Sequence, residues 1–193
     1  MGAFKQRHFF DPLPLQAYDL AVIDPPVPFE TWSDKGQGKS PSQHYHMMTL
    51  AEIMALPVRE LLKKNAVVYL WGQGRSLHQH IAMLQAWGIS FKSELVWRKL
   101  TRNGKVYWGT GKWARNQHDP ILVGTVGKPH CFALPSCLDG IVREHSRKPD
   151  EFYEMLLVKT PGLRRADIFA RERRNGFDCW GDEVDRFTRE AAA

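Results

Sequence analysis

Short apolar runs and amphipathic stretches alternate along this chain. Apolar runs predict buried strands over residues 18–23, 66–71, 119–126 and 165–170. Residues 91–98 alternate between apolar and polar, as a half-buried strand does. Helical patterns occupy residues 49–63, 76–87 and 149–159. This succession of strands and helices is typical of an α/β fold in which a mostly parallel sheet lies between helices.

Local signals mark where these helices begin and end. Thr49 with Glu52 three residues later predicts a capping box at the start of the helix over residues 49–63. Pro57 is expected to break this helix in two. Ser76 is the expected N-cap of the second helix, and Gly88 is expected to close it. Residues 27–46 and 128–147 are rich in turn formers and predict long loops. The last helix is expected to open at Pro149.

Composition indicates a globular, intracellular protein. The 193 residues, 43% of them hydrophobic, predict one domain over 1–193, with about 184–193 as a tail. No stretch reaches the roughly 20 apolar residues of a membrane helix, and the N-terminus lacks the apolar core of a signal peptide. Three cysteines without a pairing pattern favour a reducing compartment, so we expect a cytoplasmic protein of bacterial or phage origin.

The positive charge is concentrated in one segment. The chain has 27 Lys and Arg against 21 Asp and Glu, and residues 98–118 hold six cations and no acid, so the remainder is balanced at 21 against 21. Three aromatic residues and three glycines interleave with the cations. This pattern favours a loop that follows phosphates and stacks on bases over a merely solvated loop. The expected nucleic-acid contacts are Trp97, Lys99, Arg102, Lys105, Lys112, Arg115 and Asn116.

The tripeptide Asp24-Pro25-Pro26 directly follows a predicted buried strand. Ligands of open α/β sheets bind at the carboxyl ends of strands. Prolines fix the backbone and carry no N–H, so the Asp24 carboxylate and the Pro25 carbonyl form two rigid acceptors. Two acceptors suit an exocyclic amine, and they stabilise the positive charge that develops when its nitrogen attacks. Taken alone, the tripeptide is also compatible with a strand that simply ends in a proline turn.

Six segments in one order resemble an N6-adenine methyltransferase family. That family includes the catalytic subunit of the eukaryotic mRNA N6-methyladenosine writer and many phage and bacterial members. The resemblance implies a Rossmann-like fold with circularly permuted motifs and S-adenosylmethionine as cofactor. The matching segments are YDLAVIDPP (18–26), HYHMMTLAEIMALPV (44–58), AVVYLWGQGRSLHQHIAMLQAWGISFKSELVWRK (66–99), RNQHDPILVGTVGKP (115–129), HSRKPDEFYEML (145–156) and ADIFARERRNGFDCWGDE (166–183).

The resemblance also implies roles for individual residues. Asp24, Pro25 and Pro26 match the family's catalytic loop, and Asp24 also faces the cofactor. The residues matched to cofactor binding are Tyr45, Lys148, Arg171, Asp182 and Glu183. The family usually has Asn at the position of Asp182, so this contact is the least certain of the set.

Val27 departs from the family pattern, in which an aromatic residue follows the two prolines and packs against the target base. Stacking of this kind contributes about 1–3 kcal/mol. Two interpretations remain open: another ring takes its place, or the chain is a weak or inactive homologue. The candidate replacement rings are Phe29, Trp32, Tyr45, Trp71 and Trp97.

Other sequence patterns give little evidence of a further binding site. Gly72-Gln73-Gly74 lacks the third glycine of a dinucleotide fingerprint, and the histidines lack metal-ligand spacing, so no metal is expected. The sequence thus predicts an adenine-specific N6-methyltransferase that acts on DNA, with RNA as an open alternative. The rivals are a non-catalytic nucleic-acid-binding subunit and, more weakly, a small-molecule methyltransferase. A homodimer is compatible with the sequence.

Overall fold

The computed structural model describes residues 8–27, 48–144 and 146–187. Twelve elements lie in these ranges, and the strands outnumber the helices. The strands are β1 (Tyr18–Ile23), β2 (Leu62–Trp71), β3 (Ser90–Leu100), β4 (His118–Val126), β5 (Cys137–Ile141), β6 (Arg165–Ile168) and β7 (Asp178–Trp180). The helices are α1 (Leu50–Met54), α2 (Val58–Leu61), the 3-10 turn η3 (Gly74–Ser76), α3 (Leu77–Ala86) and α4 (Asp150–Lys159).

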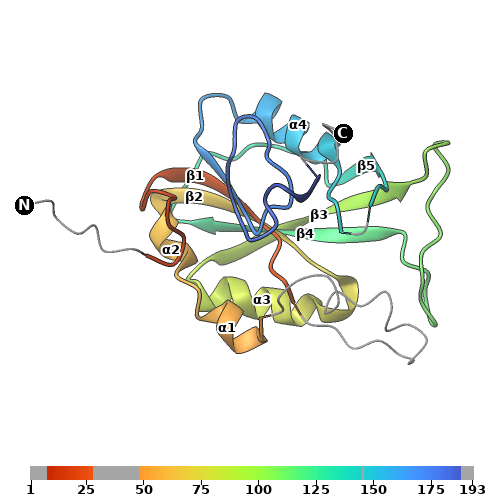
Figure 1. Cartoon of the computed structure of the whole chain (residues 1–193), viewed down its shortest axis with the longest axis horizontal. Coiled ribbons are helices and arrows are strands. Elements are labelled where there is room, and N and C mark those ends of the chain that lie inside the picture. Colours follow the sequence, from red (N-terminus) through yellow and green to blue (C-terminus); the bar gives the residue numbers. More distant parts are fainter. Residues whose placement is uncertain (1–7, 28–47, 145, 188–193) are drawn as a thin grey trace, which may run out of the picture.

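All seven strands form one sheet, in the order β5-β3-β4-β2-β1-β6-β7. Figure 1 labels β1 to β5 of this sheet. β1 pairs in parallel with β2 on one side and with β6 on the other, and β6 pairs in parallel with β7. β4 pairs antiparallel with both β2 and β3, whereas β3 and β5 are parallel. Six strands therefore point the same way and β4 alone is reversed. This α/β architecture confirms the predicted Rossmann-like fold class, with one antiparallel strand inside the sheet.

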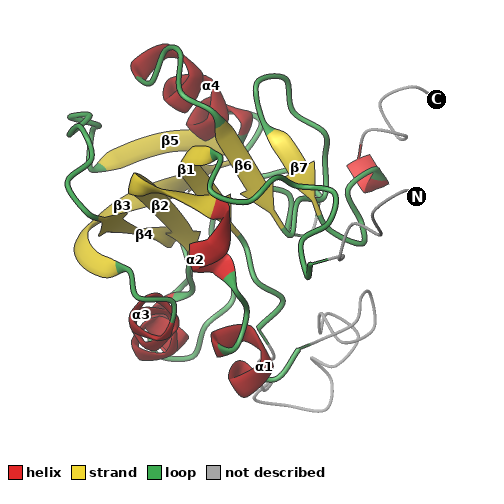
Figure 2. Ribbon diagram, turned by 90° about the vertical axis from the view of Figure 1, so that its left-hand side faces the viewer, coloured by secondary structure: helices red, strands yellow, loops and turns green. Residues whose placement is uncertain are grey.

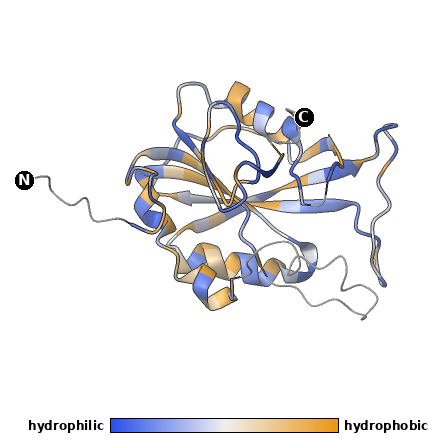
Figure 3. Ribbon diagram, in the orientation of Figure 1, coloured by the Kyte–Doolittle hydropathy of each residue, from blue (hydrophilic) through white to orange (hydrophobic). Residues whose placement is uncertain are grey.

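Helices cover both faces of the sheet (Figure 2). On one face, Ala21 and Ile23 of β1 pack with residues of α1 and α3, including Ile53 and Leu84. On the other face, Leu20 and Val22 pack against α4, represented by Phe152 and Leu156. Successive strand residues point to opposite faces, so each strand of the centre is apolar on both sides. The coloured ribbon shows this apolar centre and a polar excursion between β3 and β4 (Figure 3).

The cap predictions are mostly confirmed. Thr49 and Glu52 form the capping box, because the Thr49 side chain accepts from the Glu52 N–H and the Glu52 side chain accepts from the Thr49 N–H. Pro57 separates α1 from α2. Gly88, with φ of 69°, follows the end of α3. Ser76 holds the N-cap position of α3 as predicted, but its side chain accepts no hydrogen bond from a helix N–H and instead donates to the Gln73 carbonyl.

Two strands escaped prediction. Residues 128–147 were expected to be a loop, yet β5 lies within them, and β7 was not anticipated. Both are short edge strands whose sequences lack a long apolar run.

The relative direction of β3 and β4 also differs from the prediction, because both were expected to belong to a largely parallel sheet. They form a hairpin because no helix lies between them to make the crossover that parallel neighbours require.

The shared direction of six strands collects many loops at one edge of the sheet. The segments after β1, β2, β3, β5, β6 and β7 all leave from this edge, and the segment before β4 enters there. Ligands of open α/β sheets bind at this edge, where neighbouring connections diverge.

Among the residues that the structure describes, no helix combines the length and apolar character needed to span a membrane.

Candidate active site and nucleic-acid interface

A large cleft occupies the carboxyl edge of the sheet. Its volume is about 1740 Å³, and residues from every loop of this edge line it. The cleft brings together predicted site residues that lie far apart in the chain. These are Asp24, Pro25, Pro26, Val27, Trp97, Lys99, Lys112, Arg115, Asn116, Lys148, Arg171, Asp182 and Glu183.

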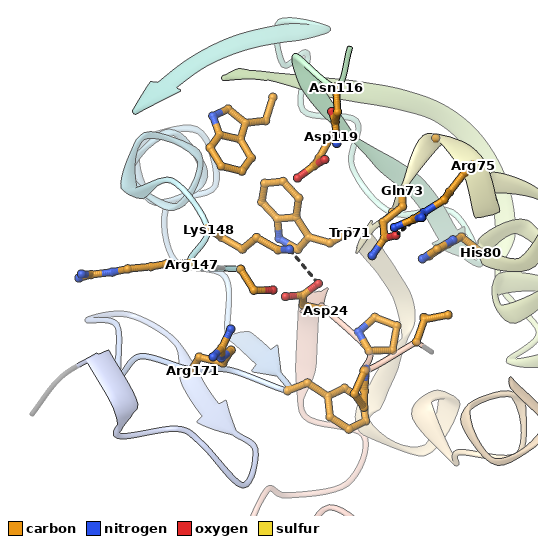
Figure 4. A pocket seen from close by; sticks show the side chains of 18 of the residues that line it. Asp24, Trp71, Gln73, Arg75, His80, Asn116, Asp119, Arg147, Lys148 and Arg171 are labelled. Atoms are coloured by element: carbon orange, nitrogen blue, oxygen red, sulfur yellow. Dashed lines mark hydrogen bonds and ion pairs between the residues drawn. The ribbon is translucent and has the colours of Figure 1, made fainter. Parts of the chain in front are cut away.

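Asp24 lies at the centre of the cleft floor, directly after β1. Its N–H donates to the Ile168 carbonyl, which extends the pairing of β1 with β6 by one residue. Its carboxylate forms an ion pair with Lys148, with 3.0 Å between Oδ1 and Nζ (Figure 4). The Lys148 ammonium also lies 5.0 Å from the centre of the Trp71 ring. The two predicted residues, 124 positions apart, therefore meet at one point.

The Pro25 carbonyl is already used once. It accepts a hydrogen bond of 2.8 Å from the Val27 N–H, which closes a tight turn. A carbonyl oxygen has two lone pairs, so one remains for an amine. Pro25 is buried and Pro26 half-buried, which fixes the direction of the carbonyl.

Val27 packs as a core residue. It is 7% exposed and belongs to the apolar cluster shared with α1 and α3, while it also lines the cleft. The position is thus closely surrounded. This packing explains how a small branched side chain fits where the resembled family has a ring.

We expect Val27→Trp to lower the free energy of unfolding by about 1–3 kcal/mol, because the larger side chain overpacks this cluster. Thermal or urea unfolding measures this loss. Val158→Trp is the matched control, since Val158 is 76% exposed and should tolerate the ring. A Val27→Trp protein of unchanged stability and higher methyl transfer would contradict the core assignment and indicate an open base-stacking position.

The backbone of Lys148 is held by two arginines. Arg143 donates to the Lys148 carbonyl at 2.7 Å, and Arg174 donates to it at 3.3 Å. Both arginines also form ion pairs with Asp150 at the start of α4. This arrangement holds the segment before α4 so that the Lys148 side chain reaches Asp24.

The far end of the cleft contains the other residues matched to cofactor binding. Arg171, after β6, forms an ion pair of 2.8 Å with Glu183, after β7. Asp182 is exposed beside them. Gly181 permits this approach, since a Cβ atom there would lie 2.8 Å from the Ala170 carbonyl oxygen.

An aromatic wall adjoins this acidic end. The Trp180 ring lies 5.6 Å from Phe9 and 5.4 Å from Phe169, and all three line the cleft. Phe9 is 50% exposed, so part of its ring is free. Phe169 has a φ of 63°, an uncommon conformation for a non-glycine residue, and such strain is frequent at functional sites.

Residues 101–117 form an arm that extends from the β3–β4 hairpin beyond the sheet (Figure 1). The Thr101 N–H donates to the Lys105 carbonyl, and Gly109 and Asn116 pair through the Gly109 N–H and the Asn116 carbonyl. The arm therefore contains an outer turn near 101–106 and an inner turn near 109–116. A Cβ atom on Gly111 would lie 1.8 Å from the Ala114 carbonyl oxygen, so the inner turn requires glycine there.

Two of the six cations in residues 98–118 are neutralised by neighbouring strands. Arg98 contacts Asp139 of β5 with two hydrogen bonds of 2.6 Å, and Lys99 pairs with Asp119 at 2.7 Å. No ion pair is recorded for the other four within the described ranges. Of these, Lys112 and Arg115 line the cleft, whereas Arg102 and Lys105 lie on the outer turn, outside it.

The rings of the arm differ in exposure from those of the floor. Trp113 is 91% exposed and Trp108 is 69% exposed, so both present free faces. Trp71 and Trp97 are 1% and 3% exposed and pack edge to face at 6.0 Å. The Trp97 Nε1–H also donates to the Gly140 carbonyl. Trp97 was predicted as a nucleic-acid contact, but its packing makes it part of the cleft wall without a free ring face.

Three of the residues singled out in the sequence are outside the described part of the chain. These are Tyr45, Phe29 and Trp32. In the ranges that are described, no group of three or more His, Cys, Asp or Glu residues is arranged to hold a metal ion. Phe187, expected to lie in a terminal tail, is 2% exposed and packs under Arg147 and Arg171.

Sequence reasoning missed several cleft residues. Gln73, which belongs to the incomplete dinucleotide fingerprint, and Arg75, to which no role was assigned, line the wall opposite Lys148 (Figure 4). Their position directly after a buried strand is the signal that indicates such a role. Phe9 gave no signal, because it precedes the first predicted element.

Comparisons with known proteins agree on one family. The MT-A70 profile matches residues 18–183. Human METTL3, an N(6)-adenosine-methyltransferase catalytic subunit, is 30% identical over 136 residues, which cover 66% of this chain and 23% of that protein. A putative N(6)-adenosine-methyltransferase MT-A70-like from Medicago truncatula is 31% identical over 118 residues, 57% of this chain and 19% of that protein. The Type II methyltransferase M.MunI from Mycoplasma sp is 26% identical over 195 residues, 91% of this chain and 81% of that protein. The matched part of this chain thus spans about a fifth of the length of human METTL3 and of the Medicago truncatula protein.

Proposed function

The chain belongs to the MT-A70 family, and from this premise we propose that it methylates N6 of adenine in nucleic acid with S-adenosylmethionine as methyl donor. The observation that carries the proposal is the cleft, which joins the Asp24-Pro25-Pro26 loop, the Lys148 cation and the arm. A small-molecule methyltransferase would have no use for the arm, with its free rings and cations.

The residues of the cleft fit the cofactor. Lys148 would supply a cation for its carboxylate, and Arg171, Asp182 and Glu183 would offer polar groups for its ribose. The aromatic wall beside Asp182 offers an apolar surface for its adenine. When bound, the cofactor supplies an electrophilic methyl group on a sulfonium sulfur.

The chain's own contribution is to orient and stabilise the amine. The Asp24 carboxylate and the remaining lone pair of the Pro25 carbonyl accept its two N–H groups. This directs the nitrogen lone pair toward the methyl group and stabilises the charge that appears on nitrogen. The target base must leave the stack to reach this floor. Trp113 and Trp108 provide free faces for neighbouring bases, and Lys112 and Arg115 pair with phosphates at the cleft rim.

DNA is the substrate that we propose. Similarity to the Type II methyltransferase spans most of both chains, whereas similarity to the adenosine methyltransferases spans a small part of theirs. The short length of the arm also favours a short recognition sequence. A competition between DNA and RNA oligonucleotides of one sequence tests the choice, and preferential methylation of the RNA would overturn it.

A second candidate follows from Val27. A binding subunit without activity would keep the arm and lose cofactor affinity. Calorimetry with S-adenosylmethionine separates the two, because we expect binding that Lys148→Met weakens. Nucleic-acid binding without cofactor binding would support the inactive subunit.

A further inference from the structure

A second acidic residue lies beneath Asp24. Asp167 of β6 pairs with Val22 of β1 in the register of the sheet. Because side chains alternate along a strand, Asp24 and Val22 point to the same face, and Asp167 points to that face as well. Asp167 is 2% exposed, so it makes no direct contact with solvent.

Asp24 and Asp167 line the same small hollow. Its volume is about 20 Å³, and Lys148, Tyr153 and Arg174 also line it. A water molecule needs roughly 10–15 Å³ of such space and two to four polar partners. The hollow meets both requirements.

The chemistry of the proposed function leaves a proton to be removed. As the nitrogen–carbon bond forms, the carbon–sulfur bond breaks and its electron pair returns to sulfur. The amine nitrogen then carries a positive charge and two protons, one of which must leave. The Asp24 carboxylate accepts a hydrogen bond from this nitrogen, so it is the first acceptor of that proton.

We propose that Asp167 is the acceptor to which this proton passes from Asp24, through one water molecule in the hollow that both residues line. The water takes the proton from Asp24 and gives one to the Asp167 carboxylate, so charge and atoms balance. The proton returns to solvent when the products leave. This inference rests on the proposed function.

The surroundings of Asp167 suit this role. Burial raises the pKa of Asp167 most strongly, Arg174 opposes this, the Asp24 charge raises the pKa, and the Tyr153 hydrogen bond and Lys148 lower it, so that the pKa lies at about 7. Cys179, its neighbour on β7, stays neutral because burial raises the pKa of its thiol to about 11. Burial also raises the pKa of Tyr153 well above its usual value. Asp167 is therefore the group here that changes charge near pH 7, as a proton acceptor should.

The test uses Asp167→Asn and Tyr153→Phe in the full chain. In the wild-type protein we expect kcat to rise with pH through about 7, as Asp167 becomes able to accept. Asp167→Asn should lower kcat about 100-fold and remove this inflection. Tyr153→Phe should move the inflection to higher pH, because the hydrogen bond that lowers the pKa is gone. A purely structural role for either residue would not shift the profile.

Infrared difference spectra of the protein without cofactor give a readout that does not depend on activity. A band from a protonated carboxyl group should titrate with a midpoint near pH 7. This band should be absent in Asp167→Asn, and its midpoint should move to higher pH in Tyr153→Phe. Melting temperatures provide a second one. Asp167 holds its proton more tightly when folded, so wild-type stability should fall relative to Asp167→Asn as pH rises from about 4 to 7, and then level off.

The outcomes separate the two hypotheses. If the wild-type protein methylates no nucleic acid, the proposed function fails. If it is active while Asp167→Asn retains the wild-type kcat and pH profile, the proton route is wrong. A rise in cofactor KM alone, with an unchanged profile, would likewise overturn it and place Asp167 in cofactor binding.

Discussion

Replacing Asp24 by alanine should reduce kcat for methyl transfer by about 100- to 1000-fold, the cost of removing one preorganised group that stabilises developing charge. The variant loses the acceptor for the amine and leaves the Lys148 ammonium, now 3.0 Å from that carboxylate, without its partner. The measurement is transfer of labelled methyl groups to adenine-containing oligonucleotides. The dissociation constant for the cofactor should change far less than kcat.

The matched control is Asp19→Asn on the same strand. Asp19 lies at the opposite end of β1, where it pairs with Lys63 at 2.7 Å, away from the cleft. This variant tests whether loss of any acid on β1 lowers activity through folding alone. Equal methyl incorporation by Asp24→Ala and wild type would sink the active-site assignment.

The double variant Lys112→Ala/Arg115→Ala should bind duplex DNA about 60-fold more weakly at roughly 0.1 M salt, if each side chain neutralises one phosphate. The slope of log affinity against log salt should become shallower by about 1.8. Both side chains line the cleft, and no ion pair satisfies either one within the described ranges. Fluorescence anisotropy over a salt series measures both quantities.

Two comparisons locate the effect on the arm. Arg98→Gln should change the slope less, because Asp139 already neutralises Arg98 with two hydrogen bonds. Arg102→Ala/Lys105→Ala removes equal charge from the outer turn, which lies outside the cleft. Equal losses from the inner and outer pairs would show that the arm acts only through its total charge, contrary to the placement proposed above.

The position of the Asp24-Pro25-Pro26 loop, directly after a buried strand and in the cleft, is well predicted because its signal is local. A buried strand followed directly by Asp24-Pro25-Pro26 fixes both the backbone and its place at a sheet edge. The capping box at Thr49 is equally local, and the structure confirms it. By contrast, the pairing of Asp24 with Lys148 depends on two segments that meet only through the sheet, so no spacing indicates it.

The neutralisation of part of the basic segment likewise depends on strand pairing. Five of its six cations were expected to contact nucleic acid, and one of these, Lys99, pairs with Asp119 of β4, while the sixth cation, Arg98, pairs with Asp139 of β5. β5 lay in a segment predicted to be a loop, so its register with β3 was hidden. Val27 shows the same limit, because its burial depends on packing against α1 and α3 and not on its neighbours in sequence.

The reversed strand β4 has a consequence for how such proteins diversify. Because β3 leaves the sheet and β4 re-enters it at the same edge, residues 101–117 begin and end on adjacent, paired strands. Closure of a longer loop costs little extra entropy, about 0.6 kcal/mol for each doubling of length. The arm can therefore be lengthened, shortened or exchanged as a cassette without rethreading the sheet. If the proposed function holds, grafting the corresponding hairpin from a relative should change the nucleic-acid sequence that this chain prefers.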